Sequence, residues 1–336
     1  MPRNNMPPNW QPPAPAWCAQ WDKNSDPLVV AYFAIQADSP DKLDAWAETA
    51  LYRQNPPARI EKGAYTDQAD VKNYLYICYW QQSEYLAWWA NPKHCTWWSD
   101  PQRCNDGVGY WREVITMPLD RFETLNSSTE PHGVSAVAKT LTGPIEEHGY
   151  PGGMRDRIAL SDHHDLKNSR DMNRKMPAVV SDKGKRVVVT PPENTCVIRS
   201  GQNWSYCEGE QKKFYLEEVH PVLKKGMQFL RDNPVDSGCY CLRFVDLKES
   251  DNTNKWNNTS QTFGLGYASD IHAFEEWAKS HPTHIAILEN FMRMVGTFGE
   301  NLKLKLWHEV TVLPKEGCEF EYIACHNNTG LLNYSQ

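Results

Sequence analysis

Three histidines near the C-terminus are the side chains best placed to do chemistry. His281 and His284 are almost one helical turn apart, and His308 lies on the next predicted strand. An imidazole can bind a metal, accept a proton or donate one near neutral pH. Two histidines in apolar surroundings can therefore form a metal site, an acid–base pair, or one metal ligand opposite one acid.

The strand that carries His308 places it among apolar neighbours. On an alternating strand, Leu306, His308 and Val310 share one face. A histidine there could belong to a functional site. A core or surface histidine that is bonded to a backbone carbonyl explains the position equally well.

The available ligands limit the kind of metal centre. A dedicated zinc site needs three or four closely spaced ligands, and the sequence offers no clear set of carboxylates or cysteines for it. Haem supplies four nitrogens and needs one axial ligand, so a helical histidine beside an aromatic-rich pocket suits it better. The 14 tryptophans can line such a pocket. No Cys-x-x-Cys-His motif is present, so we expect any haem to be bound non-covalently.

The composition favours a large folded protein and excludes some partners. The chain has 336 residues, 40% of them hydrophobic, enough for one large domain or two medium ones. The net charge of −7 argues against a general nucleic-acid or anionic-membrane binder. No continuous apolar run resembles a signal peptide or a membrane span, so we expect a cytoplasmic protein with mostly free cysteines.

The first half of the chain shows the order β-α-β-β-α-β, which is the ferredoxin-like pattern. Several prolines before position 16 predict that residues 1–27 form an extended N-terminal arm. Helices are predicted after Pro40 and after Ser83. Strands are predicted at residues 28–35, 58–65, 72–80 and 109–117.

The second half repeats the same order of elements. Tyr110–Pro118 parallels Leu306–Pro314 at an offset of 308 − 112 = 196 residues, which aligns His308 with Arg112. Strands are predicted at residues 186–198, 239–247, 262–267 and 302–312, with helices at about 210–231 and 271–294.

These patterns predict an α+β fold built by internal duplication. Two ferredoxin-like units, residues 28–135 and 186–330, would carry antiparallel sheets flanked by helices and pack as one pseudo-symmetric domain. Residues 136–185 connect them and are rich in glycine and proline near 149–153. We expect this connection to form a shaped active-site loop.

Seven short segments carry a resemblance to a known family: Glu147–Tyr150, Met154–Arg157, Ile198–Trp204, Phe229–Asn233, Ser280–His284, Leu306–Val310 and Glu321–Ile323. In content and order they resemble the aldoxime dehydratases, haem enzymes that convert aldoximes to nitriles. The resemblance covers nearly all of the folded chain, from about residue 28 to 332. The fold that it implies, a haem-binding α+β domain of the dimeric α+β barrel type, agrees with the duplication.

The resemblance implies a role for five residues. His284 looks like the proximal haem ligand, and His308 looks like the distal catalytic histidine. Arg157 and Ser200 match further active-site residues of the family, and Glu123 matches an acid through a shorter motif. No chemical step is assigned to His148, because a structural loop role explains it equally well.

The implied reaction is the dehydration of an aldoxime at ferrous haem b. The oxime nitrogen would bind the iron directly, and Ser200 would orient the oxime hydroxyl toward His308, the general acid and base. Another haem enzyme of the same fold, such as a peroxidase-like relative with a distal arginine or aspartate, remains an alternative. So does a haem protein without catalysis. The sequence leaves open alkyl or aryl-aliphatic aldoximes as substrates and allows a homodimer.

Overall fold

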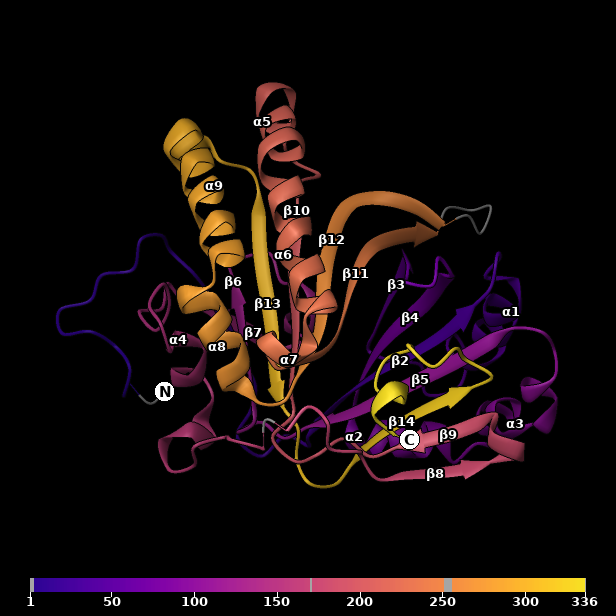
Figure 1. The fold of residues 1–336 in the computed structure, drawn as a ribbon. Helices are drawn as coiled ribbons and strands as arrows, with labels where there is room; N and C mark the ends of the chain where they lie inside the picture. The colour runs from indigo at the N-terminus through magenta and orange to yellow at the C-terminus, as the bar shows by residue number, and fades with distance from the viewer. Residues whose placement is uncertain (1–2, 170, 251–255, 336) are drawn as a thin grey trace.

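The structure, a computed structural model, describes residues 3–169, 171–250 and 256–335. These residues form one 12-stranded sheet, a separate two-stranded sheet, and helices that pack on the large sheet (Figure 1). The strand pairs described in the large sheet are antiparallel. The α+β class predicted from the sequence is therefore confirmed.

The first half follows the predicted β-α-β-β-α-β order. Its first strand is a fully buried run rich in β-branched and aromatic side chains, and the helix that follows buries an apolar face. The elements are β2 (Leu28–Gln36), α1 (Asp41–Ala50), β3 (Arg59–Thr66), β4 (Lys72–Gln81), α2 (Gln82–Trp89), α3 (Pro92–Ser99) and β5 (Gly109–Met117).

The second half has the same order, with two helical regions that are each divided. The first region is α5 continued through a π-helical turn, η5, into α6. The elements are β10 (Cys196–Asn203), α5 (Gly209–Phe214), η5 (Tyr215–Val219), α6 (His220–Asp232), α7 (Pro234–Ser237), β11 (Cys239–Ser250), β12 (Trp256–Ala268), α8 (Ile271–Ser280), α9 (Pro282–Phe298) and β13 (Lys305–Val312).

Two predictions for the second half were wrong, and proline explains both. The single strand predicted at 186–198 is two strands, because Pro191 and Pro192 lie between them and have no backbone N–H for a ladder. The single helix predicted at 271–294 is α8 followed by α9. Pro282 begins α9, and His281 before it is extended, with φ −76° and ψ 131°.

The remaining elements are short. They are β1 (Cys18–Gln20), η1 (Pro101–Cys104), β6 (Phe122–Asn126), η2 (Gly133–Val137), β7 (Thr140–Thr142), α4 (Gly153–Asp156), η3 (Ala159–Asp162), β8 (Ala178–Ser181), η4 (Asp182–Gly184), β9 (Arg186–Val189), η6 (Gly299–Asn301), β14 (Cys318–Ile323) and η7 (Leu332–Tyr334).

The two halves exchange strands within the large sheet. Its order is β6-β13-β10-β12-β11-β3-β4-β2-β5-β14-β9-β8. Strand β6 follows the first half in the chain but pairs with β13 of the second half, and β14 follows the second half but pairs with β5 of the first. In each half, the last strand therefore pairs with a strand that comes from the other half.

The sheet separates an inner core from two outer layers. The inner core combines side chains of both halves, so the inner faces of the two halves pack against each other. Helices α1, α2 and α3 cover the outer face of the first half, and α6 and α8 cover that of the second. Phe33, Trp46, Trp88 and Trp98 fill the space beneath the first-half helices.

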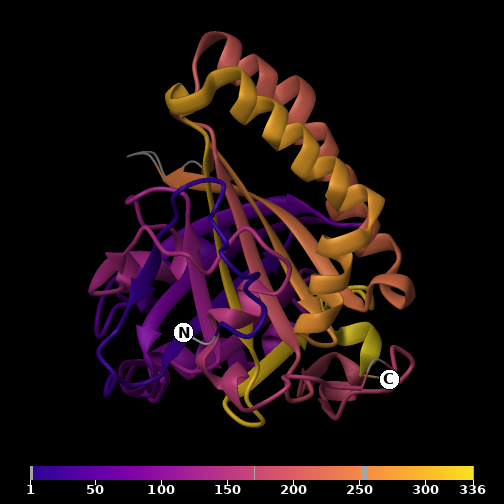
Figure 2. The ribbon, with the colours of Figure 1, turned by 90° about the vertical axis from the view of Figure 1, so that its left-hand side faces the viewer.

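A pair of helices extends beyond the sheet in the second half. Helices α5–α6 and α9 run side by side and lean away from the strands (Figure 2). Within the described part of the chain, no helix combines the length and the apolar character that crossing a bilayer requires.

The close packing between β10 and β13 yields a stability prediction. A Cβ atom at Gly201 would lie 2.0 Å from the indole ring of Trp307, its partner in the strand register. We therefore expect Gly201→Ala to lower the free energy of unfolding by about 1–3 kcal/mol through overpacking, measured by urea denaturation. Gly296→Ala in α9, where a Cβ would meet nothing within 4 Å, should instead be neutral or stabilising. Equal stability of the two variants would contradict this packing.

Candidate active site

His308 and Ser200 lie side by side on the outer face of the second-half sheet. Strands β13 and β10 are antiparallel, and their register places Ser200 directly opposite His308. Side chains of such a pair project from the same face with Cβ atoms about 4.5–5.5 Å apart. On the other side of Ser200 the register partner is Gly264, which has no side chain. A hydroxyl and an imidazole can thus reach one small ligand above this face.

A buried ion pair lies behind His308. Arg157 donates from Nε to Glu123 Oε2 at 2.7 Å and from Nη2 to Oε1 at 3.0 Å. The side chains of Arg157 and Glu123 are 3% and 1% exposed. Burial alone would raise the pKa of Glu123, but the charges of Arg157 and His308 outweigh it and lower that pKa to about 2. Glu123 is therefore a carboxylate at any working pH.

The same ion pair contacts one nitrogen of His308. Nε2 of His308 lies 2.9 Å from Glu123 Oε1 and 2.9 Å from Arg157 Nη2. A protonated Nε2 can donate to the carboxylate, whereas an unprotonated Nε2 can accept from the guanidinium. Among the described residues, Nδ1 of His308 has no hydrogen-bond partner. Nδ1 is therefore the ring nitrogen that can exchange a proton with a ligand.

Arg157 reaches this position from the loop between the two halves. It is the C-cap of the short helix α4, which begins after Gly152 in the left-handed region, with φ 89°. Its Nη1 also donates to the backbone carbonyl of Glu147 at 2.6 Å, which holds the guanidinium from the loop side. Glu123 comes from β6, so the strand exchange is what brings the carboxylate beside His308.

His284 lies on α9, whose Ile287 packs against the outer-face core of the second half. Among the described residues, Nδ1 of this histidine lacks a hydrogen bond of good geometry, although it is buried. Burial lowers the pKa of His284, and the Ala278 carbonyl opposes this shift only in part. A neutral imidazole without a committed partner is the state that binds a metal.

The surface of α9 around His284 fits a large apolar group. Ile285, Leu288 and Met292 lie on one stripe of the helix and are 38%, 51% and 44% exposed. Apolar patches of this kind usually mark a binding surface. Within the described residues no cluster of three or more histidines, cysteines or carboxylates could hold a bare metal ion. A haem with one histidine ligand therefore fits this site better than a simple ion.

His281 is committed to a structural task. It is the N-cap of α9, and its Nδ1 accepts from the Thr283 backbone N–H at 3.3 Å. Its ring also stacks on Phe229 at 3.8 Å between centroids. These contacts leave His284 as the histidine of this segment that can take a ligand.

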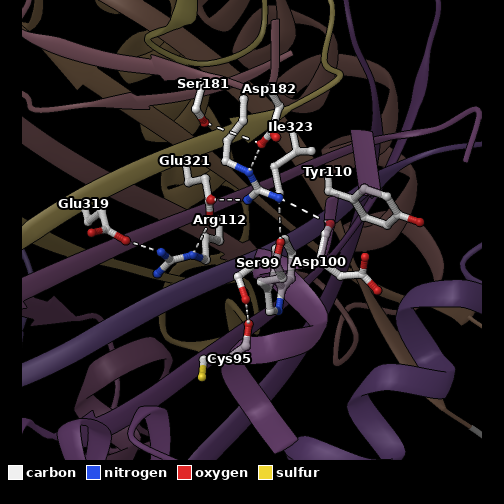
Figure 3. Close-up of polar contacts among 12 residues, drawn as sticks. Cys95, Ser99, Asp100, Tyr110, Arg112, Ser181, Asp182, Glu319, Glu321 and Ile323 are labelled. Atoms are coloured by element: carbon white, nitrogen blue, oxygen red, sulfur yellow. Dashed lines mark hydrogen bonds and ion pairs between the residues drawn. The ribbon is translucent and has the colours of Figure 1, made fainter. Parts of the chain in front are cut away.

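The first half contains a counterpart of the site with different side chains (Figure 3). Arg112, at the position of His308, donates to Glu321 of the exchanged strand β14 at 2.6 Å, and Arg186 donates to the other oxygen of that carboxylate. A glutamate thus lies between two arginines, where Glu123 lies between an arginine and a histidine. His94, the counterpart of His284, is stacked on Trp88 with Nδ1 2.7 Å from its carbonyl oxygen. In the second half, by contrast, Nδ1 of His308 and the imidazole of His284 remain available for a ligand.

Four residues predicted from the sequence are brought together. His308, Arg157 and Glu123 are in direct contact, and Ser200 is adjacent to His308 in the register. His148 is buried near them, and burial followed by the charge of Arg157 lowers its pKa. Within the described residues, Nε2 of His148 lacks a hydrogen bond of good geometry, although the Ala14 backbone carbonyl partly opposes the fall in pKa.

The sequence reasoning missed strand β6, which positions Glu123. Its five residues, Phe122–Asn126, do not alternate, because polar Glu123 and Thr124 are adjacent, so the strand signal is weak. It also missed the contacts of the N-terminal arm with the loop that carries Arg157. Those contacts leave no signal in residue type or spacing.

Comparison with known proteins identifies the family of the chain. A family model described as haem-containing dehydratase matches residues 22–331. An aliphatic aldoxime dehydratase of Pseudomonas chlororaphis is 34% identical over 97% of this chain and 93% of its own. A phenylacetaldoxime dehydratase of Bacillus sp. (strain OxB-1) is 33% identical over 98% of this chain and 94% of its own.

Two solved structures of aldoxime dehydratases have the same fold as this chain. A crystal structure of an aldoxime dehydratase matches with a TM-score of 0.89 and 33% identity, covering 100% of this chain and 95% of the other. A second, in complex with butyraldoxime, also has a TM-score of 0.89, with 32% identity over 100% of this chain and 93% of the other. The family model and these structures thus place the chain among the haem-containing dehydratases. More particularly, the chain belongs to the aldoxime dehydratase family, whose members are hydro-lyases.

The low pKa of Glu123 predicts how stability depends on pH. A fall from the usual 4.5 to about 2 corresponds to about 3 kcal/mol of stabilisation. Because the folded-state pKa is the lower one, this contribution is complete above about pH 4.5 and is lost as the pH falls through about 2. Glu123→Gln should therefore be less stable than the wild type by about this amount at pH 7, and the difference should shrink below pH 4.

Urea denaturation at a series of pH values measures this effect. Glu319→Gln is the matched control, because Glu319 pairs with Arg112 in the counterpart site but is 50% exposed. An exposed pair contributes about 1 kcal/mol or less. A Glu123→Gln variant as stable at pH 7 as Glu319→Gln would contradict the buried ion pair.

Proposed function

We propose that this protein dehydrates aldoximes to nitriles, with haem held by His284 and protons moved by His308. The observation that carries the proposal is the pairing of Ser200 with His308 on one sheet face, backed by the Glu123–Arg157 ion pair. Family membership supports it, as does the similar structure that contains butyraldoxime. Relatives named for aliphatic aldoximes and for phenylacetaldoxime make both alkyl and aryl-aliphatic aldoximes candidate substrates.

The cofactor in this proposal is non-covalent haem b, ferrous in the active state. The imidazole of His284 would hold the iron, and Ile285, Leu288 and Met292 would provide apolar surface for the macrocycle. When bound, ferrous haem would take the oxime nitrogen as a ligand and supply electron density to the N–O bond.

Ser200 would orient the substrate for proton transfer. Its hydroxyl can donate to and accept from the oxime hydroxyl. Because Ser200 and His308 are direct neighbours across two strands, that bond would hold the oxime oxygen toward the imidazole. Gly264 on the other side of Ser200 adds no side chain that would compete for this oxygen.

His308 would carry out both proton transfers through Nδ1. The imidazolium gives its Nδ1 proton to the oxime hydroxyl as the N–O bond breaks, which releases water. The now neutral ring takes the proton from the aldoxime carbon as the nitrile triple bond forms. The imidazolium is thereby regenerated, and the sum of the steps is the loss of one water molecule.

Glu123 and Arg157 would keep His308 in the tautomer that this cycle needs. With Nε2–H directed to Glu123 Oε1, the proton that moves is always the one on Nδ1. The guanidinium holds Glu123 through two bonds and prevents the carboxylate from rotating away. The pair acts as a positioning unit that does not itself need to touch the substrate.

We also propose that the two halves are copies of one ferredoxin-like unit and form a single pseudo-symmetric haem-binding domain. The equal element order and the reciprocal exchange of β6 and β14 support this. The units would span residues 28–135 and 186–330, after an N-terminal arm of residues 1–27 and around a connection at 136–185. In the first unit, tryptophans fill the space that the cofactor would take in the second.

A peroxidase-like enzyme of related fold is the main alternative. Such an enzyme would need a distal arginine or aspartate free to act on peroxide. Arg157 is instead held by both oxygens of Glu123 and by the Glu147 carbonyl. This arrangement favours acid–base chemistry by His308.

Anaerobic turnover tests the proposal. Dithionite-reduced, haem-loaded protein mixed with butyraldoxime or phenylacetaldoxime should show a Soret shift and form the corresponding nitrile, measured by gas chromatography. Air-oxidised protein is the control and should be much less active. A Soret shift without nitrile would support a non-catalytic haem protein, and peroxide-dependent dye oxidation without nitrile would support the peroxidase alternative. Either outcome would overturn the proposal.

A further inference from the structure

The N-terminal arm, residues 3–17, packs along the loop formed by residues 146–157. In Figure 1 the beginning of the chain lies beside α4, at the end of this loop. Trp10 donates from its indole nitrogen to the His148 carbonyl at 2.9 Å. Its ring also makes an edge contact with Tyr150, at 5.5 Å between centroids. An arm expected to be merely extended is thus bound to the loop that carries Arg157.

Besides ion pairs of Arg3 with Glu146 and Glu147, the arm makes a polar contact between Asn5 and buried Asp156. Asp156 is fully buried and immediately precedes Arg157. Its carboxylate accepts from the Asn5 backbone N–H at 3.1 Å, from the Asn5 amide at 2.7 Å and from the Tyr150 hydroxyl at 2.9 Å. No cation in the described part of the chain pairs with it. This buried charge therefore depends on neutral donors, and Asn5 supplies two of the three.

Two glycines of the loop allow the arm to approach the backbone. A Cβ at Gly152 would lie 2.6 Å from Cβ of Asn5, and a Cβ at Gly149 would lie 2.7 Å from Cδ of Pro13. Both glycines also have positive φ, 89° and 80°, which other residues rarely adopt. The loop is therefore shaped to receive the arm.

The loop connects the arm to His308 through Arg157. Arg157 donates to the Glu147 carbonyl on one side and to Glu123 and His308 on the other. The turn that ends at Arg157 is only four residues long and contains Asp156. A shift of Asp156 would move the guanidinium away from His308, since the two residues are adjacent in the chain.

We propose that Asn5 is a positioning residue for the reaction, acting through Asp156 and Arg157. The N-terminal arm thereby belongs to the active-site structure, although it does not touch the substrate. This inference rests on the proposed function, because the effect is exerted through the site of His308. A displacement of about 1 Å at a catalytic group can lower the rate by up to about a hundredfold.

Substitutions at two neighbouring asparagines test the inference in the full-length, haem-loaded protein. Asn5→Ala and Asn5→Asp should lower kcat by about ten- to a hundredfold and leave KM and haem content nearly unchanged, because Ser200 and His284 are untouched. Asn4→Ala and Asn4→Asp are matched controls, since Asn4 is exposed, as Asn5 is, but takes part in none of the hydrogen bonds above. They should retain wild-type kcat. Equal kcat values for the two positions would overturn the inference.

A charge exchange tests the contact itself. Asn5→Asp places a second carboxylate against buried Asp156, so the two repel each other and the arm should detach. The double variant N5D/D156N exchanges carboxylate and amide between the two positions and should recover most of the lost kcat. Failure of the double variant to recover activity, with Asn5→Ala equal to Asn4→Ala, would contradict the Asn5–Asp156 contact.

A double-mutant cycle with Arg157→Gln separates this positioning role from a general structural one. If Asn5 acts through Arg157, Asn5→Ala should lower kcat in the wild-type background but have little further effect in Arg157→Gln. Equal fold losses in both backgrounds would overturn the inference and leave the proposed function intact. An Arg157→Gln variant with full activity would instead overturn the proposed role of Arg157.

Discussion

The contact among Glu123, Arg157 and His308 is the interaction on which the rest of the site depends. Its three members come from β6, from the loop between the halves and from β13, so it forms only when the exchanged strand is in place. Glu123 is buried, yet its pKa falls to about 2 because two cationic partners outweigh the cost of desolvation. A buried carboxylate of this kind fixes the direction of an imidazole ring. The exchange of β6 into the second half therefore determines whether Glu123 can contact His308.

The two halves of the chain share one order of elements but carry different side chains at equivalent positions. In the first half, arginines surround Glu321, and His94 is used against Trp88. In the second half, His308 replaces the arginine, and the helices lean away from the sheet and expose apolar side chains of α9. The proposed proton carrier, His308, and the proposed cofactor surface on α9 thus occur in the same half. The first half supplies Glu123 from β6 and the side chains of β2, β4 and β5 that pack in the inner core.

Much of this fold was predictable from the sequence, because its periodicities are local. The strand at Gly109–Met117 and its repeat counterpart near His308 are rich in β-branched and aromatic residues, and the prolines mark where elements end. The pairing of β6 with β13 was not predictable, since residue types do not encode which distant strand is the neighbour. The same limit applies to Asn5 and Asp156, which are common residues whose meeting depends on how a proline-rich arm folds back. Of the site residues, His308 could be singled out by its difference from Arg112, whereas Glu123 needed the structure to place it.

The central claim is a division of labour between two histidines on one cofactor, and the ferrous resonance Raman spectrum tests it most directly. The iron–histidine stretching band should persist in haem-loaded His308→Ala, which should still bind aldoxime but lose most turnover. In His284→Ala the protein should purify largely without haem, and after reconstitution the band should be absent until imidazole is added. Full haem loading and an unchanged band in His284→Ala, or loss of the band in His308→Ala, would contradict the account.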